Sequence, residues 1–104
     1  MQNFNQSQLT DSMQGDPIEY LEFFRASSLS TGIYHLDTGS VDPQNPHDED
    51  EIYYVLAGDA SFTSGAKTIL IKQGDILFVA SAEKHKFHDI TQDLTLLVFF
   101  TATK

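Results

Sequence analysis

The sequence predicts an all-β fold, a sandwich or a barrel, in one domain. Six or more short apolar runs follow one another at close and even spacing. Glycine-containing turns separate several of these runs, and none of the runs shows a convincing 3.6-residue period. A chain of 104 residues is long enough to bury a core of its own.

The chain divides at Pro17. Residues 1–16 are polar and glutamine-rich, with isolated apolar side chains. We expect this segment to be a flexible arm, and an arm that docks on a neighbouring subunit is the alternative. Residues 17–104 have a higher apolar content and form the single predicted domain.

Two strands are expected before the centre of the chain. Residues 18–24 (IEYLEFF) fit a strand or a short helix, and their aromatic content favours the strand. Residues 29–36 form the second strand. Residues 38–46 contain one glycine and two prolines, so they are expected to form a loop that cannot pair regularly.

The remaining strands follow closely, at residues 51–57, 60–63, 68–72, 76–80, 85–90 and 94–102. The Gly58-Asp59 dipeptide is typical of a tight turn and should end the first of them. The last run is apolar on both faces, with Leu97 and Phe99 opposite its other apolar side chains. A strand buried on both faces in so small a domain predicts a homodimer that covers the outward face.

Composition argues against several classes of partner. The net charge of −9 disfavours nucleic acid and anionic membranes, because both need a basic face. The chain has no cysteine, which excludes disulfides and thiolate metal sites. No apolar run approaches membrane-spanning length and no signal-peptide pattern begins the sequence, so we expect a cytoplasmic protein.

Three side chains are candidate metal ligands. His47 closes the proline-rich loop, Glu51 begins the next strand, and His85 follows the turn after residues 76–80. Two imidazoles and one carboxylate suit a divalent transition metal and leave coordination positions open for substrate, water or oxygen. Iron, manganese, nickel, copper and zinc all fit this ligand set, and the ligand types do not choose among them.

Strand alternation separates the histidines. If Glu51 points into the barrel, His85 and Asp89 share the inward parity on their own strand, and His88 faces the opposite way. His88 is therefore expected at the surface or at an interface. His35 lies in the middle of a strand and is expected to be structural.

Aromatic side chains are expected to line or fill the barrel; they are Tyr53, Tyr54, Phe62, Phe78 and Phe87. Most of them should be plain core residues. Tyr53 is the exception, because it shares the parity of Glu51 and its hydroxyl can orient a ligand. Tyr53 is the candidate catalytic residue.

These residues resemble the two conserved motifs of the cupin superfamily. The first motif is matched by Gly39, His47, Glu51 and Gly58. The second is matched by Gly74-Asp75, the hydrophobic strand that follows, and His85. The resemblance implies a small double-stranded β-helix, or jelly-roll, barrel with one divalent metal bound by His47, Glu51 and His85.

One position departs from the family pattern. Asn45 stands where the family has its first histidine, and an amide is a poorer ligand for transition metals. The neighbouring Gln44 is the alternative fourth ligand, provided that the proline-flanked loop bends toward the metal.

Cupins span dioxygenases, isomerases, sugar-modifying enzymes and non-catalytic binders, so the fold does not fix the function. The first hypothesis is a metal-binding enzyme, oxygenase-like or isomerase-like, that acts on a small polar molecule. The second is a non-catalytic barrel that binds or senses a small ligand. The third hypothesis is a dimer that serves only as a scaffold.

Overall fold

Strands account for nearly all regular structure in the computed structural model, which describes residues 1–102. The elements are α1 (Gln6–Ser12), β1 (Ile18–Arg25), β2 (Leu29–Leu36), β3 (Glu51–Ser64), β4 (Lys67–Lys72), β5 (Ile76–Val79) and β6 (His85–Thr101). The predicted all-β class is confirmed. Thr103 and Lys104, with which the predicted domain ends, lie outside the described residues.

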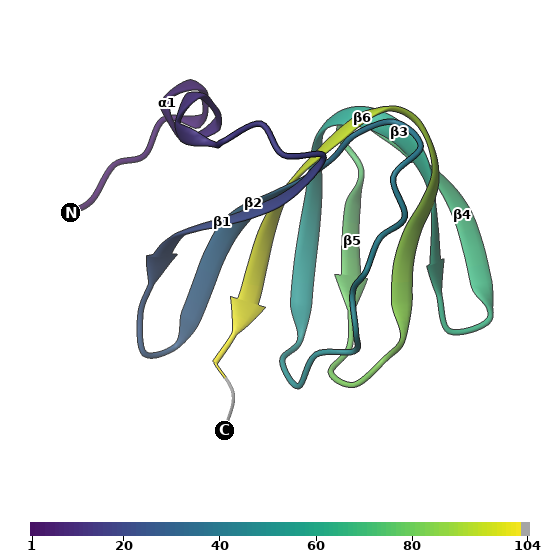
Figure 1. Cartoon of the computed structure of the whole chain (residues 1–104). Helices are drawn as coiled ribbons and strands as arrows, with labels where there is room; N and C mark the ends of the chain where they lie inside the picture. The colour runs from purple at the N-terminus through teal and green to yellow at the C-terminus, as the bar shows by residue number, and fades with distance from the viewer. Residues whose placement is uncertain (103–104) are drawn as a thin grey trace.

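All strand pairs are antiparallel, and the strand order is β1-β2-β6-β3-β4 with β5 added to the start of β3. Figure 1 shows β1 and β2 at one side of the molecule, β4 at the other, and the long strands β3 and β6 between them. β6 pairs with both β2 and β3, so it joins the two halves of the curved sheet.

The curvature of β3 and β6 brings distant residues together. Glu51 and Ser64 are the two ends of the 14-residue strand β3, which would span more than about 40 Å if it were straight. Ser64 pairs with His85 at the start of β6. Nevertheless, Glu51 Oε1 lies 2.7 Å from His85 Nε2. The two strands therefore fold over themselves and close the barrel.

The bend falls at Gly58, where the sequence predicted a turn that ends the strand. That prediction is wrong, because β3 continues through Gly58 to Ser64. The β3–β6 register shifts three times between Val55 and Ser61. Gly58 has φ 108°, and a Cβ there would lie 2.4 Å from the Asp93 carbonyl oxygen. Only glycine fits this bulge, because the position needs both a left-handed conformation and close backbone approach.

The two faces of the last strand differ as the alternation predicted. Leu94, Leu96 and Val98 are buried in the core, whereas Phe99 is 40 % exposed on the outward face. On β3, Glu51, Tyr53 and Val55 are likewise buried. The expectation that Tyr54 and Phe78 line the barrel is wrong, because both side chains are exposed. Each alternates with a buried neighbour, and the pleat turns it outward.

The N-terminal segment contacts its own chain. It contains α1, a short helix with no buried residue, which stands off the sheet beside β1 in Figure 1. The Glu19 carboxylate accepts hydrogen bonds from the backbone N–H groups of residues 14–16. Phe4 packs its ring against Phe23 at 5.0 Å. The predicted flexibility of residues 1–16 stays a prediction.

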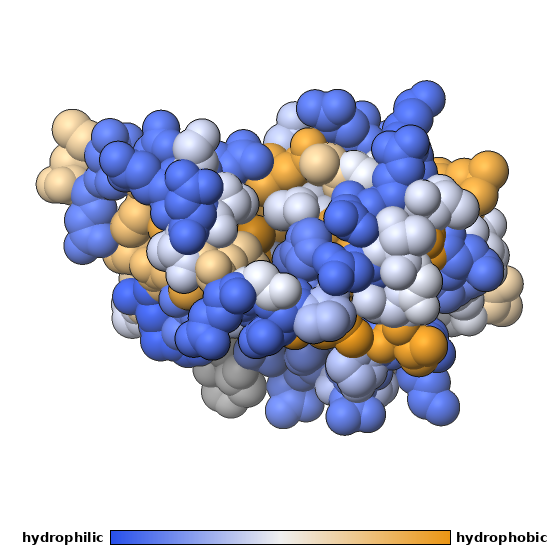
Figure 2. Space-filling model, turned by 45° about the horizontal axis from the view of Figure 1, so that its top comes forward, coloured by the Kyte–Doolittle hydropathy of each residue, from blue (hydrophilic) through white to orange (hydrophobic). Residues whose placement is uncertain are grey.

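Hydrophilic side chains cover most of the side of the molecule shown in Figure 2, with hydrophobic atoms gathered at separate points between them. Within residues 1–102, no helix has both the length and the apolar character needed to cross a membrane.

Candidate metal centre

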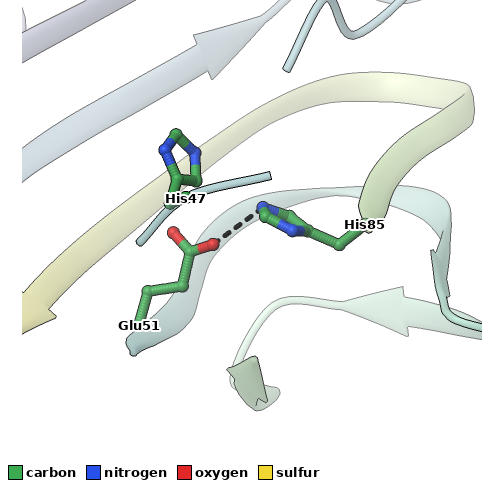
Figure 3. A group of neighbouring side chains, drawn as sticks. All are labelled: His47, Glu51 and His85. Carbon is green, nitrogen blue, oxygen red and sulfur yellow. Dashed lines mark ion pairs between the residues drawn. The ribbon is translucent and has the colours of Figure 1, made fainter. Parts of the chain in front are cut away.

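Three side chains from separate parts of the chain converge at one end of the barrel. His47 comes from the loop before β3, Glu51 is the first residue of β3, and His85 is the first residue of β6. One candidate ligand atom from each lies within 4.8 Å of the other two. Figure 3 shows the two imidazoles and the carboxylate pointing toward one another. The structure thus brings together all three residues that the sequence singled out.

The Glu51 carboxylate is buried without hydrogen bonds to the described part of the chain, which is energetically unfavourable. The residue is only 1 % exposed, and Oε1 lies 2.7 Å from His85 Nε2. Neither carboxylate oxygen makes a hydrogen bond of suitable geometry to a described residue. A buried carboxylate without hydrogen bonds costs several kcal/mol, on the order of the penalty for a buried ion, and the contact with His85 offsets this cost only when that imidazole is protonated. A divalent cation between Glu51 and the imidazoles would offset this cost, so the residues fit a metal.

The His85 ring is oriented by the backbone. Nδ1 lies 2.9 Å from the Glu83 carbonyl oxygen and donates its hydrogen there, which leaves Nε2 to face Glu51. Burial by itself lowers the pKa of His85, but the Glu51 carboxylate and the Glu83 carbonyl outweigh it and hold the pKa above its usual range. In the metal-free protein a proton therefore competes for the nitrogen that a metal would use.

Gln44, and not Asn45, reaches the cluster. The Gln44 Oε1 atom lies 3.1 Å from His47 Nε2 and 3.3 Å from His85 Nε2. Asn45 is exposed. The loop between β2 and β3 places Gln44 with its carbonyl oxygen toward the two imidazoles. This oxygen lies within 3.3 Å of a nitrogen of each imidazole.

Tyr53 contacts the cluster through its hydroxyl group. Its hydroxyl donates to Gln44 Oε1 at 3.0 Å and lies 3.0 Å from His85 Nε2. Burial, reinforced by the negative charge of Glu51, raises the pKa of Tyr53 well above its ordinary value. The hydroxyl therefore stays protonated at physiological pH and acts as a hydrogen-bond donor.

The other two histidines lie outside this group. His35 Nε2 pairs with Asp37 at 2.7 Å. His88 contacts Asp89 at 2.8 Å and the Thr63 hydroxyl at 2.7 Å on the outer side of the sheet. Both placements agree with the expectations from sequence.

The predicted inward direction of Asp89 is wrong. The Asp89 side chain is 79 % exposed. Its φ of 48° interrupts the regular alternation, so Ile90, the next residue, takes the buried position.

A cavity of about 350 Å³ opens beside the cluster. Its lining includes Gln44, His47 and Tyr53, which belong to the cluster or contact it. The walls and rim are formed by Tyr20, Glu22, Arg25, Ser30, Tyr34, Pro43, Glu49, Val98 and Phe100. This volume is at the lower end of the range for small-molecule sites, which is about 300–1,000 Å³.

Sequence reasoning missed Asp42. It is 3 % exposed and accepts hydrogen bonds from Tyr34, Gln44 and the backbone of Phe87. In the sequence it belongs to a loop rich in acidic residues. No feature of that loop separates a buried acid from solvated ones.

Comparison with known proteins gives one family and one fold. Residues 32–100 match the family model described as "Cupin domain". An uncharacterized protein of Streptomyces coelicolor, SCO3923, is 38 % identical over 101 residues, which are 97 % of this chain and 96 % of that protein.

Solved structures are similar over most of the chain. TT1209 from Thermus thermophilus has a TM-score of 0.80 and 20 % identity, and covers 98 % of both chains. A predicted oxalate decarboxylase from Thermotoga maritima has a TM-score of 0.71 and 26 % identity, over 82 % of this chain and 80 % of that one. The DMSP lyase DddQ from Ruegeria pomeroyi has a TM-score of 0.76 and 24 % identity, over 84 % of this chain and 48 % of that one.

Proposed function

The chain belongs to the cupin domain family, and from that premise we propose that it is a metal-binding enzyme for a small molecule. His47, Glu51 and His85 are the proposed ligands, with the Gln44 amide oxygen as the fourth donor. The observation that carries the proposal is the buried Glu51 carboxylate, whose oxygens lack hydrogen bonds and face two imidazoles.

The metal would act as a Lewis acid or as an oxygen-activating centre, in an oxygenase-like or isomerase-like reaction. The donor set combines two imidazole nitrogens with two oxygens. Imidazole suits iron, nickel, copper and zinc, whereas carboxylate and carbonyl oxygens also suit manganese. Glu51 is the only charged ligand of the four, so it sets the charge balance of the site.

Tyr53 is the proposed catalytic residue. Tyr53 lines the cavity, and its hydroxyl lies within hydrogen-bond distance of Gln44 and His85. Because its raised pKa keeps it neutral, it would donate a hydrogen bond to a polar atom of the substrate by turning its single O–H away from Gln44 Oε1, to which it donates in this structure. It would not act as a general base.

The substrate would be small and polar at the end that meets the metal. The cavity walls near the cluster are largely aromatic, with the Tyr20 ring 6.3 Å from Phe100 and 6.2 Å from Tyr34. At the rim, Arg25 is already paired with Glu22 at 2.6 Å. Two acidic side chains, Glu22 and Glu49, therefore accompany one neutralised cation at the rim. Among residues 1–102, the rim offers no free positive charge to an anionic substrate group far from the metal.

The aromatic walls also favour a second candidate function. They do not depend on the metal ligands, so the cavity can hold a small ligand without catalysis. A non-catalytic binding or sensing barrel would keep its affinity for that ligand when the metal ligands are removed. An enzyme would lose turnover and metal together.

We also propose that the protein is a homodimer. Two apolar rows cross β5, β3 and β6 on the outward face, and their cross-strand neighbours are Phe78–Ile52–Phe99 and Ile76–Tyr54–Leu97. Five of these six side chains are at least 38 % exposed. Contiguous apolar surface of this kind is a liability in a monomer. Sedimentation that gives a monomer at micromolar concentration would contradict the dimer.

The metal proposal is tested by elemental analysis of the purified chain and matched variants. Wild type should hold one divalent ion per chain. His47→Ala and His85→Ala should lose it, and His88→Ala should keep it, because His88 lies on the outer side of the sheet. Full metal occupancy in both His47→Ala and His85→Ala would remove the site and the function built on it.

A further inference from the structure

Asp42 is a buried carboxylate directly behind Gln44. Its Oδ1 accepts from the Tyr34 hydroxyl at 2.6 Å and from the Gln44 backbone N–H at 3.2 Å. Its Oδ2 accepts from the Phe87 backbone N–H at 3.0 Å and from Gln44 Nε2 at 2.8 Å. Four donors thus bond to two carboxylate oxygens, each of which accepts about two hydrogen bonds when ionised. The hydrogen-bonding capacity of the Asp42 carboxylate is therefore filled.

The bond to Asp42 determines which end of the Gln44 amide faces the cluster. Because Nε2 donates to Asp42, Oε1 must point the other way, toward Tyr53 and the imidazole of His47. A flipped amide would set its oxygen against the Asp42 carboxylate, where two acceptors repel each other. It would also set an NH₂ group, which has no lone pair for a metal, toward the imidazoles.

We propose that Asp42 is a positioning residue that fixes the polarity of the Gln44 amide, so that an oxygen and not an NH₂ group completes the site. This inference rests on the proposed metal site. His47, Glu51 and His85 alone would hold the metal more weakly. By keeping the Gln44 oxygen turned toward the metal, the contact between Asp42 and Gln44 adds a fourth ligand. Groups that orient a ligand from behind typically change metal affinity by about 10–100-fold.

The first test measures the dissociation constant of Zn²⁺ by competition with a chelator. Asp42→Ala should weaken binding by about 10–100-fold. Asp42→Asn should fall between it and wild type, since its one oxygen can still accept from Gln44 while its NH₂ faces the Tyr34 hydroxyl. Ile71→Ala is the matched control, because Ile71 is buried in the core but does not line the cavity. Equal Zn²⁺ affinity in Asp42→Ala and Ile71→Ala would overturn the proposal.

A second test uses the wild-type chain and does not depend on Asp42→Ala folding. Glutamine labelled with ¹³Cδ and ¹⁵Nε2 is observed by NMR, and Gln44→Met assigns the Gln44 signals. The Gln44 NH₂ hydrogens should exchange slowly with water in the metal-free protein, and its Cδ signal should shift when Zn²⁺ is added. Rapid exchange of these hydrogens would overturn the proposal.

The same Zn²⁺ titration distinguishes failure of the proposed metal site from failure of the proposed role of Asp42. If Zn²⁺ shifts the His47 and His85 signals but leaves Gln44 Cδ unmoved, the metal site stands and the role of Asp42 is overturned. If Zn²⁺ moves neither imidazole, the metal site itself is overturned, and the role of Asp42 with it.

Discussion

Two buried carboxylates, Asp42 and Glu51, lie at or near the cluster and have different surroundings: Asp42 bonds to Gln44, and Glu51 faces His85. Asp42 is 3 % exposed and accepts four hydrogen bonds. Glu51 is 1 % exposed, and neither of its oxygens has a hydrogen-bond partner among the described residues. Both acids lose their hydration on folding. Four hydrogen bonds compensate Asp42, whereas Glu51 has a contact with His85 that compensates its charge only while that imidazole is protonated.

The difference separates an acid whose charge is compensated by hydrogen bonds from an acid whose charge a bound cation would compensate. A carboxylate whose lone pairs are all used by backbone, amide and hydroxyl donors holds the surrounding loop in place. A carboxylate without hydrogen bonds beside two imidazoles is destabilising until an imidazole is protonated or a metal cation binds. The burial of an acid therefore says little about its role, whereas its hydrogen-bond partners say much.

The largest expected effect is the stabilisation of the protein by metal. Zn²⁺ at about 100 times its dissociation constant should raise the free energy of unfolding by about 2.7 kcal/mol. The gain should be much smaller in Glu51→Gln, which lacks the charged ligand. Thermal unfolding with and without Zn²⁺ measures both, and an equal gain in the two proteins would show that Glu51 does not bind the metal.

The next effect compares isosteric changes at the two acids in metal-free protein at pH 8. Asp42→Asn should lower the free energy of unfolding by about 2 kcal/mol, because a buried donor loses its acceptor and a charged hydrogen-bond network becomes neutral. Glu51→Gln should be neutral or stabilising, since it removes an uncompensated charge. Urea unfolding measures the pair, and the reverse ranking would refute the comparison.

A smaller effect is expected from pH. The folded-state pKa of His85 is raised, so in metal-free protein the His85–Glu51 contact adds stability that is fully present below about pH 6.5. This contribution is lost as the pH rises through the folded-state pKa. The stability of wild type relative to Glu51→Gln should thus increase toward acid pH. Zn²⁺ affinity should change in the opposite direction, because the proton on Nε2 must leave before the metal binds.

The smallest effect should come from removing the metal from a correctly folded chain. The ligands lie at strand ends, and the core beneath them is apolar. Unlike small zinc modules, this domain should fold without its metal. A chelator should therefore leave the far-ultraviolet circular dichroism spectrum nearly unchanged, and cooperative loss of the β signal would refute this.

The convergence of His47, Glu51 and His85 could be predicted from the sequence because the patterns that indicate it are local. The spacing of His47 and Glu51, the strand alternation after Glu51 and the position of His85 after a turn are all visible in short windows. The same alternation correctly buries Leu94, Leu96 and Val98. Period-two patterns report direction wherever the backbone stays regular.

The predictions from sequence were wrong or incomplete where the backbone is irregular or where the contacts are long-range. The bulge at Gly58 looks like a turn until the close approach of Asp93 is known, and the left-handed conformation of Asp89 reverses its direction. Asp42 contacts Tyr34 on β2 and Phe87 on β6, which are 8 and 45 residues away from it in the sequence. Nothing in a short window around Asp42 records those partners.

Anomalous X-ray diffraction from crystals of the full chain, grown with saturating Zn²⁺, tests the metal centre most directly. The account predicts one peak, about 2.0–2.2 Å from nitrogen atoms of His47 and His85 and from an oxygen of Glu51. It also predicts that Gln44 turns its oxygen toward that peak and its nitrogen toward Asp42. A metal-saturated crystal with no peak between these side chains, or with the Glu51 oxygens bonded only to water, would contradict it.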